Sequence, residues 1–263
     1  ATSKDAFSER LERLDTSLFE AIPSESTPWD RRSLLACQHA VRMRWSPYVY
    51  LEIGSHLGGS LQPHVLDPGC AAMHSIDPRP SQQPDARGAR FGYPGNSTAR
   101  MLANLSATGR DTTRVVCHEQ TSARLNPADI APTPQLCFVD GEHTDAAVLA
   151  DFDFCRRVIT PGGLILFHDA HIIYNALDEI VASLDRAGTA YCACHLPDTL
   201  FAIELGEGSL IEGPALARVR HQSYRGYLLS LRSTDHYRRF ANRWLFRALR
   251  KVGAVATQGP TRS

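Results

Sequence analysis

Two apolar segments of the chain are each followed directly by acids and histidines. The first leads into Asp140, Glu142 and His143, and the second leads into His168, Asp169 and His171. If the segments are neighbouring strands of a parallel sheet, their carboxyl ends bring three acids and three histidines to one rim. Like charges in one cleft repel, and a divalent cation relieves the repulsion. Carboxylate-rich sites suit Mg²⁺ or Mn²⁺, so the pattern predicts a cation site, and the alternative is a rim without chemistry.

A glycine-rich loop follows an earlier apolar segment. Residues 48–60 read YVYLEIGSHLGGS, so a buried strand runs through an acid into a tight turn and then a helix. Open α/β sheets bind ligands at such carboxyl ends, where glycines let the backbone approach closely. The spacing is not the G-x-G-x-x-G of dinucleotide-binding loops. With Glu52 two residues before Gly54, it favours a nucleoside with a cationic or zwitterionic tail, and an ordinary strand–helix turn is the alternative.

A third candidate, Asp77, stands 23 residues beyond Gly54 and closes the next apolar segment. An acid at this range can accept hydrogen bonds from both hydroxyls of a ribose. Because Pro78 follows, the alternative is an aspartate that only forms a turn.

The elements that must position these residues alternate along the chain. We expect strands at 48–54, 71–76, 114–118, 135–140, 164–167, 190–195 and 199–205. Apolar periodicity predicts helices at 5–22, 30–45, 58–66, 98–108, 144–159 and 172–187, with Pro23 and Pro28 breaking the first. Residues 79–96 are rich in Pro, Gly, Gln and Arg and are expected to form a loop. This order indicates an α/β fold with a doubly wound, mostly parallel sheet, and a late hairpin adds an antiparallel strand at its edge.

Composition indicates a folded domain with extensions and excludes a disordered chain. Of the 263 residues, 43% are hydrophobic and 21% are charged. Residues 209–263 hold 11 Lys and Arg against 2 Asp and Glu, whereas residues 1–208 hold 17 against 26. Seven cysteines without a disulfide-like spacing, no visible signal peptide and no membrane-spanning apolar stretch predict a reduced, cytoplasmic protein.

The basic tail contains a predicted amphipathic helix at 235–251. Five arginines surround its stripe of aromatic and aliphatic residues. We expect the stripe to pack on the protein's own body or on a second subunit in a homo-oligomer. Peripheral contact with an anionic membrane is an alternative, and an anionic substrate or nucleic acid is another. Nucleic-acid binding is not expected, because basic and aromatic residues do not interleave elsewhere.

Four signals, in this order and at these distances, carry a resemblance to a known family. They are the EIGSHLGGS loop, Asp77, FVDGEH at 138–143 and PGGLILFHD at 161–169. Over residues 47–205 the chain resembles class I S-adenosylmethionine-dependent methyltransferases. The last two signals resemble the metal-assisted O-methyltransferases that act on sugars and natural products. One departure is His56, which stands where the second glycine of the family loop, E/D-x-G-x-G-x-G, would be.

The resemblance implies a seven-stranded, Rossmann-like methyltransferase fold with N-terminal helices and a C-terminal helical extension. The implied organisation is an N-terminal helical cap at 1–46, an S-adenosylmethionine-binding domain at 47–208 and a basic helical extension at 209–263.

The resemblance also implies a cofactor site. Glu52 is expected to meet the ammonium group of S-adenosylmethionine, directly or through water, and Gln120 or Thr121 its adenine. The alternative is that Gln120 and Thr121 belong to an ordinary polar loop, because a loop after any strand has the same pattern. The implied cofactor-binding residues are Glu52, Gly54, Ser55, His56, Ser60, Asp77, Gln120, Thr121 and Asp140.

At the rim, the resemblance implies Asp140, His168 and Asp169 as ligands of Mg²⁺ or Mn²⁺. Related enzymes usually carry an acid at the position of His168, and imidazole is a poorer ligand for Mg²⁺. This change tilts the site toward Mn²⁺, Fe²⁺ or Zn²⁺, or toward no metal. We predict His143 as the general base, because histidine titrates near operating pH and can accept a hydroxyl proton. Its alternative role is to cap the helix that begins at Thr144.

The function implied is an S-adenosylmethionine-dependent O-methyltransferase whose acceptor is a hydroxyl of a small molecule, a sugar or a glycosylated product. Two alternatives come from other classes. One is a non-catalytic nucleoside-binding module whose basic tail recruits a partner, and the other is an NAD(P)-dependent oxidoreductase. The loop at 79–96 and the N-terminal helices are expected to cover the pocket, and they contain no recognition code that identifies the acceptor.

Overall fold

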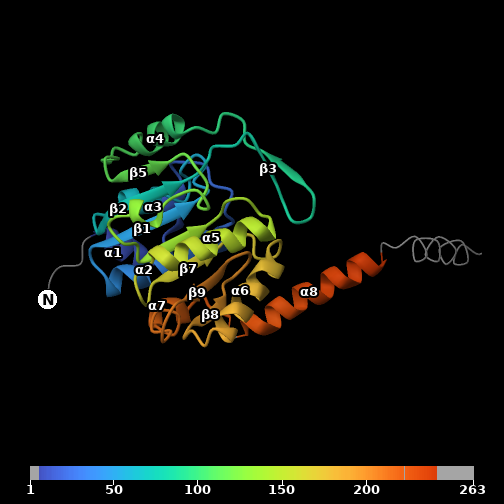
Figure 1. The fold of residues 1–263 in the computed structure, drawn as a ribbon. Helices are drawn as coiled ribbons and strands as arrows, with labels where there is room; N and C mark the ends of the chain where they lie inside the picture. Colours follow the sequence, from blue (N-terminus) through green and yellow to red (C-terminus); the bar gives the residue numbers. More distant parts are fainter. Residues whose placement is uncertain (1–5, 222, 242–263) are drawn as a thin grey trace, which may run out of the picture. The chain divides into compact units, whose positions relative to one another are not determined.

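The computed structural model describes residues 6–221 and 223–241. By internal contacts the chain divides into two compact units, residues 1–224 and residues 225–263. The sheet and the candidate site lie in the first unit (Figure 1). The predicted division at 1–46, 47–208 and 209–263 stays a prediction.

The described residues contain one large sheet and one small one. The large sheet holds β1 (Tyr48–Ile53), β2 (Cys70–Ile76), β5 (Val115–His118), β6 (Leu136–Val139), β7 (Leu164–Phe167), β8 (Cys192–His195) and β9 (Phe201–Glu204). Its order is β5-β2-β1-β6-β7-β9-β8, and only β9 runs antiparallel to its neighbours. The predicted seven-stranded, mostly parallel sheet is confirmed. The antiparallel strand lies one place in from the edge, because β9 inserts between β7 and β8.

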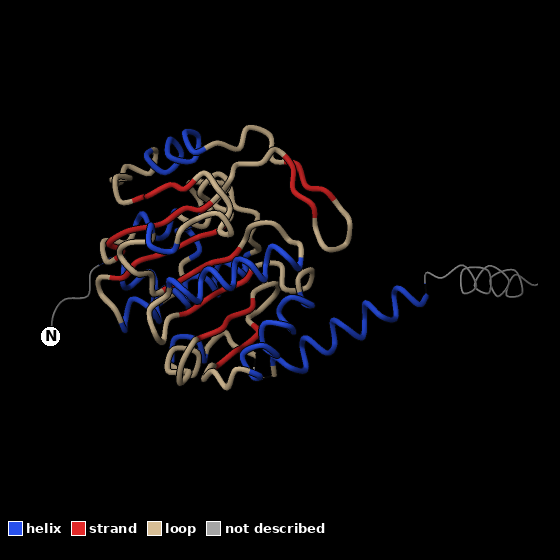
Figure 2. The backbone as a smooth tube through the Cα atoms, in the orientation of Figure 1, coloured by secondary structure: helices blue, strands red, loops and turns tan. Residues whose placement is uncertain are grey.

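Helices cover both faces of this sheet (Figure 2). The α-helices are α1 (Ala6–Glu12), α2 (Pro28–Arg44), α3 (Gln62–Leu66), α4 (Thr98–Ser106), α5 (Asp145–Val158), α6 (Tyr174–Arg186), α7 (Pro214–Ala217) and α8 (Tyr224–Ala241), and the 3-10 helices are η1 (Thr16–Phe19) and η2 (Pro127–Asp129). Residues of α1, α2, α3, α4 and α7 share one hydrophobic cluster with one sheet face. The helices α5 and α6 pack side by side in front of the sheet in Figure 1.

The strand β1 lies where the order in which the chain adds strands to the sheet reverses. All six of its residues are buried, as expected for a parallel strand covered on both faces. From β1 the chain builds β2 and then β5 on one side, and it returns to build β6 and β7 on the other. Ligands bind outside the carboxyl ends of strands at such a switch point. The loop after β1 therefore faces the same space as the residues after β6.

The predicted helix at 5–22 is wrong beyond its first part. The helix α1 ends at Glu12, and Leu14 takes a positive φ of 54°. The Asp15 carboxylate then accepts a hydrogen bond from the Ser17 N–H (3.1 Å) and starts η1. Short polar side chains bind nearby backbone groups and so compete with helix continuation. Pro28 begins α2 at a favoured first position rather than only ending a helix.

The segment 79–96 is not a plain loop, so that expectation is wrong. It contains the antiparallel pair β3 (Gln82–Pro84) and β4 (Arg90–Gly92). The Asp85 carboxylate stabilises the connecting turn by accepting from the Arg87 N–H (2.9 Å) and the Ala89 N–H (2.7 Å). A backbone bridge joins Asp85 to His143, which ties this hairpin to the rim of the sheet.

The tail helix begins earlier than predicted. The helix α8 starts at Tyr224 instead of residue 235, and the predicted part at 242–251 lies outside the described residues. Whether the apolar stripe packs, dimerises or touches a membrane stays a prediction. No helix among the described residues is both long and apolar enough to cross a membrane.

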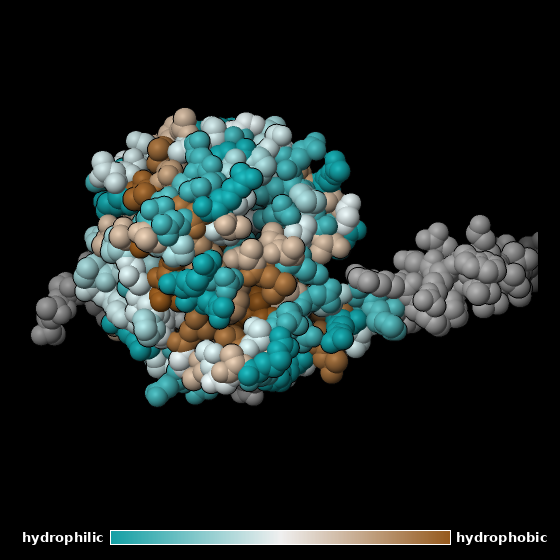
Figure 3. All heavy atoms as spheres, viewed as in Figure 1, coloured by the Kyte–Doolittle hydropathy of each residue, from teal (hydrophilic) through white to brown (hydrophobic). Residues whose placement is uncertain are grey.

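Apolar side chains are concentrated inside the first unit. The large aromatic residues Tyr48, Tyr50, Phe138 and Phe167 are fully buried. On the face seen in Figure 3, hydrophobic atoms gather near the centre and hydrophilic ones surround them. Burial of the central strands fixes where their carboxyl ends emerge.

Gly54 lets the end of β1 approach the residue after β6. Its φ is 91°, and a Cβ placed there would overlap the backbone of Asp140. The Asp140 N–H meanwhile donates to the Ile53 carbonyl (2.8 Å). Any larger residue must push the two strand ends apart.

We expect Gly54→Ala to destabilise the fold far more than Gly88→Ala. Both glycines have positive φ, 91° and 81°, but a Cβ at Gly88 meets nothing within 4 Å. The control should cost about 1–2 kcal/mol for backbone strain alone. Gly54→Ala should cost roughly 2–5 kcal/mol in total, because overpacking adds about 1–3 kcal/mol to the strain. Urea denaturation measures both, and equal losses would show that the close approach is not needed.

Candidate active site

A cavity of about 160 Å³ opens at the carboxyl ends of β1, β6 and β7. Five parts of the chain line it: an N-terminal segment, the loop after β1, the end of β2, the hairpin segment and the rim. The lining residues are Pro23, Ser24, Glu25, Gly54, Ser55, His56, Leu57, Gly59, Ser60, Asp77, Gln83, Tyr93, Asn96, Asp140, His143, His168 and Asp169. The N-terminal and hairpin residues border the pocket, as the sequence predicts.

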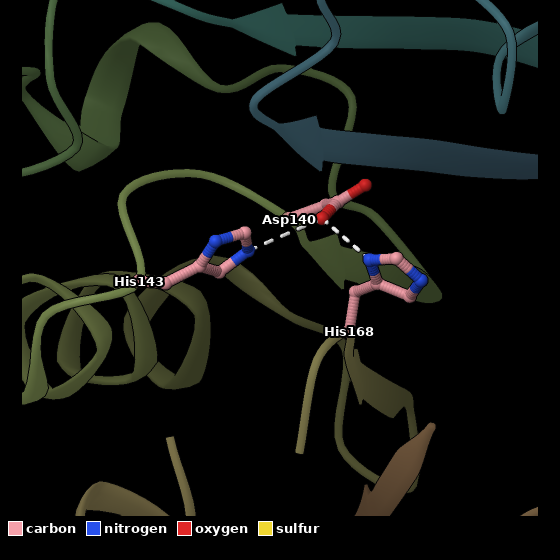
Figure 4. Close-up of side chains that lie close together, drawn as sticks. All are labelled: Asp140, His143 and His168. Atoms are coloured by element: carbon pink, nitrogen blue, oxygen red, sulfur yellow. Dashed lines mark hydrogen bonds and ion pairs between the residues drawn. The ribbon is translucent and has the colours of Figure 1, made fainter. Parts of the chain in front are cut away.

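The rim brings together four of the six predicted acids and histidines. His168 Nδ1 lies 2.9 Å from Asp140 Oδ1, and His143 Nε2 lies 3.5 Å from the same oxygen (Figure 4). Asp169 Oδ2 is 3.6 Å from His143 Nε2 and 4.0 Å from His168 Nδ1. Neighbouring parallel strands β6 and β7 place these residues in register. Two imidazoles therefore share the carboxylates of Asp140 and Asp169.

Glu142 and His171 stand outside this group. Glu142 accepts a hydrogen bond from the Thr144 hydroxyl (2.7 Å), and His171 is 42% exposed. The Thr144 hydroxyl also accepts from the Ala147 N–H (3.3 Å), so Thr144 is the N-cap of α5. The alternative that His143 caps this helix is therefore wrong. The side chain of His143 lines the pocket instead.

The two imidazoles and the carboxylate shift one another's ionisation. Burial opposes charge on Asp140, but the charge on His168 and the pairing with both histidines lower its pKa to about 2. Burial lowers the pKa of His168, yet the carboxylates of Asp140, Asp30 and Asp169 raise it well above its usual value. The pKa of His143 is also raised, because Asp140 and Asp169 outweigh burial. The cavity thus holds negative charge that favours cationic ligands.

The donor atoms at the rim fit a divalent cation. One ligand atom each from Asp140, His143 and His168 lies within 4.8 Å of the others. Within the described part of the chain, His143 Nε2 is buried and has no hydrogen-bond partner. Two imidazoles with a carboxylate suit Mn²⁺, Fe²⁺ or Zn²⁺ better than Mg²⁺. The predicted ligand Asp169 adjoins this group through His143.

The loop after β1 accommodates His56 in place of a glycine. His56 takes a positive φ of 41° and its ring packs edge-on against Tyr93, with centroids 5.0 Å apart. The His56 N–H donates to Asp77 Oδ2 (2.9 Å). The departure from the family loop thus keeps a glycine-like backbone and turns the side chain toward the hairpin.

Asp77 is almost fully bonded within the protein. Besides the His56 N–H, it accepts from the Arg79 N–H (2.7 Å) and from Arg79 Nη1 (3.2 Å). A carboxylate offers about four acceptor positions, so the three observed donors leave about one. Two ribose hydroxyls need two positions, which requires Arg79 Nη1 to move. The sequence did not identify Arg79 as a functional residue. An arginine two residues after Asp77 does not by itself indicate that the two side chains are in contact.

Glu52 lies directly behind the pocket rather than in its wall. It is fully buried and accepts hydrogen bonds from the Tyr50 hydroxyl (3.0 Å) and from the Ser60 hydroxyl. Burial raises its pKa to about 8. Ser60 does line the pocket, so these two predicted residues form one connected pair.

The predicted adenine-side residues are not among those that line this cavity. Gln120 is half-buried and Thr121 is exposed. The neighbouring Ser122 is buried and donates to Asp151, a second buried acid, whose pKa burial raises to about 7. The roles of Gln120 and Thr121 stay predictions.

Comparison with known proteins points to a methyltransferase. Residues 51–170, just under half of the chain, match a family model for a methyltransferase domain. This similarity favours a methyltransferase over the oxidoreductase and the non-catalytic module. None of the curated proteins matches the sequence.

Solved structures of similar fold match this chain at low identity. Cofactor-bound Rv0187 from MTB is 12% identical with a TM-score of 0.50, and the match covers 78% of this chain and 91% of that one. The calicheamicin methyltransferase CalS11 is 18% identical with a TM-score of 0.49, over 79% and 95% of the chains. TomG from Streptomyces achromogenes, an O-methyltransferase of tomaymycin synthesis in complex with SAM, is 13% identical with a TM-score of 0.49, over 78% and 91%.

We expect Glu52→Gln to remove a pH dependence of stability. The folded protein keeps the Glu52 proton up to a pKa of about 8, whereas the unfolded chain loses it near 4.5. A raised pKa gives stability that is full below the unfolded value and is lost as pH rises through the folded value. The Tm of the wild type should therefore fall relative to the variant from about pH 5 to about pH 9.

Thermal denaturation followed by circular dichroism measures this difference. The exposed Glu20 provides the control, because Glu20→Gln removes a carboxyl group that is not buried. Its curve should run parallel to that of the wild type. Parallel curves for Glu52→Gln and wild type would contradict the buried proton.

Proposed function

We propose that this chain transfers the methyl group of S-adenosylmethionine to a hydroxyl oxygen of a small molecule, a sugar or a glycosylated natural product. The observation that carries the proposal is a single cavity with two chemically different sides. The loop after β1 and Asp77 form one side, and Asp140, His143, His168 and Asp169 form the other. A nucleoside donor and a hydroxyl acceptor can meet between them.

The donor side of the cavity is lined by the loop after β1, through Gly54, Ser55, His56 and Ser60. In the proposal, Glu52 supports the donor's ammonium group through Ser60, which bonds it. Asp77 accepts from the ribose, Asp140 contacts the donor at the junction of the two sides, and Gln120 or Thr121 binds the adenine. The carboxylates of Asp77 and Asp140 along this path suit the two positive charges of the donor.

On the acceptor side, His143 is the proposed general base. Attack of a hydroxyl oxygen on the methyl carbon requires the proton to leave that oxygen, and a neutral imidazole can take it. The carboxylates of Asp140 and Asp169 raise the pKa of His143 and favour its protonated form. Positive charge bound in the same cavity opposes them, because a like charge disfavours the imidazolium. His143 thus becomes competent as a base when the donor is present.

The proposed metal ligands are Asp140, His168 and Asp169. A divalent cation held by these residues would supply Lewis-acid chemistry, which would orient acceptor oxygens and stabilise a developing alkoxide. His168 contributes a neutral donor among acids, which favours Mn²⁺ over Mg²⁺.

The remaining wall of the cavity suits a polar, hydroxyl-bearing acceptor. Glu25, Gln83 and Asn96 offer hydrogen-bonding groups, and Tyr93 offers an aromatic face. Burial and the nearby acids, first among them Glu25, raise the pKa of Tyr93 to about 12. Its hydroxyl therefore stays protonated and can donate to an acceptor oxygen. Sugars present both hydroxyls and apolar C–H faces, which match this lining.

The cofactor assignment predicts binding of S-adenosylhomocysteine and S-adenosylmethionine to the full chain, and no binding of NAD or NADP. Isothermal titration calorimetry checks it. Asp77→Asn should weaken binding by roughly tenfold or more, since it removes a charge-assisted hydrogen bond worth about 1.5–3 kcal/mol. Asp111→Asn, at an acid outside the pocket, should leave affinity unchanged. Absence of any heat with either adenosyl ligand, on folded protein, would end the assignment.

The general-base assignment predicts that His143→Ala loses about 10²–10⁴-fold in methyl transfer. The measurement is transfer of radiolabel from S-adenosylmethionine to a panel of nucleotide-activated sugars and glycosides. Affinities for S-adenosylhomocysteine and Mn²⁺ should stay within about twofold, because a base holds neither ligand. His171→Ala is the control, since His171 lies near Asp169 yet outside the cluster. Loss of Mn²⁺ affinity in His143→Ala would instead make His143 a metal ligand.

A further inference from the structure

One carboxylate of the rim comes from outside the matched methyltransferase domain. Asp30 lies in the first turn of α2, before residue 51, and is fully buried. Its Oδ2 is 3.5 Å from His168 Nε2. Sequence reasoning missed it, because Thr27-Pro28-Trp29-Asp30 indicates a helix start and nothing more. The contact joins two segments that are far apart in the chain.

Asp30 is held rigidly by four neutral donors. Its Oδ2 accepts from the Thr27 N–H (3.1 Å) and hydroxyl (2.9 Å), which closes the capping box of α2. Its Oδ1 accepts from the Thr199 N–H (3.1 Å) and hydroxyl (3.0 Å) before β9. The amino end of a helix also favours a negative charge. The carboxylate is therefore fixed in place and charged beside His168.

The ring of His168 lies between two carboxylates. Its Nδ1 faces Asp140 at 2.9 Å, and its Nε2 faces Asp30. The imidazole packs edge-on to Phe138 and its side chain is only 8% exposed, so it cannot turn freely. Within the described residues, Nε2 is buried and has no hydrogen-bond partner, and the Asp30 carboxylate faces it at 3.5 Å. In metal sites, a ligating histidine commonly donates its second ring N–H to a carboxylate, which fixes the tautomer.

We propose that Asp30 is a positioning residue that keeps a proton on Nε2 of His168 and thereby aims Nδ1 at Asp140 and the cavity. This inference rests on the proposed function only where a cation binds at Nδ1. The α2 segment is thus part of the catalytic unit, and it acts through His168 without touching the substrate.

The first test reads the ring nitrogens of His168 in the full chain without metal. In ¹⁵N-histidine-labelled wild type, NMR should find Nε2 protonated and its proton slow to exchange with water. Asp30→Asn removes the negative charge that faces this nitrogen, so exchange should become roughly tenfold faster, as expected when the ion pair that holds the proton is lost. An Nε2 without a proton in the wild type would overturn the proposal, even if the variant failed to fold.

Two control variants separate positioning from stability. Thr27→Ala and Thr199→Val each delete one hydroxyl that binds Asp30, and both keep the charge beside His168. Both should lower the Tm and leave the Nε2 exchange rate within about twofold of wild type. If either control accelerates exchange as much as Asp30→Asn does, Asp30 has only a structural role.

The second test is Mn²⁺ affinity measured by electron paramagnetic resonance. Asp30→Asn should bind Mn²⁺ about 10–100-fold more weakly, which is the usual effect of losing such an outer carboxylate. The two threonine variants should bind as the wild type does. A wild type that binds no Mn²⁺ contradicts the metal part of the proposed function, and the NMR result then decides the role of Asp30 alone.

Discussion

The carboxylates that meet at the ends of the buried strands must be paired with positive charge. The arrangement of the site follows from this requirement. Asp30, Asp140 and Asp169 lie on three different elements, and His168 lies within 4.0 Å of all three. In a poorly solvated cavity, unpaired carboxylates repel and cost several kcal/mol each. The imidazoles of His143 and His168 neutralise part of this charge, which is why their pKa values rise against burial. The negative charge that is not neutralised favours cations in the cavity. A sulfonium donor and a divalent metal ion are both cations.

The balance of charge at the rim also depends on how closely the ends of β1 and β6 approach each other. Gly54 allows the end of β1 to contact the backbone of Asp140, and this contact sets the width between the donor side and the rim. The residues of the loop that follows then bond across to the end of β2, where Asp77 holds the His56 N–H and Arg79. Hydrogen bonds within the protein therefore anchor this loop.

Segments on both sides of the matched domain either line the cavity or hold the residues that support it. Pro23, Ser24 and Glu25 border it from the N-terminal side, and Asp30 supports His168 from α2. The Thr199 backbone, after the domain match ends, bonds the same carboxylate. The matched domain therefore supplies the rim and most of the sheet, whereas β8, β9 and the N-terminal lining of the cavity lie outside it.

Local patterns were enough to predict the sheet and the polar ends of its strands. Apolar runs ending in Glu52, Asp77, Asp140 and His168 identified the strands, because a parallel strand buried on both faces leaves its polar residues at the ends. The family loop and its acids likewise followed from spacing. Only the tertiary structure decided which polar groups meet: His143 with Asp169, His168 with Asp30, and Asp77 with Arg79. Each pair either joins elements that are far apart in the sequence or depends on the φ of a turn residue. No short-range sequence pattern predicts the distance between such side chains. The hairpin at 82–92 escaped prediction for a related reason, since its strands are short and exposed and only their pairing defines them.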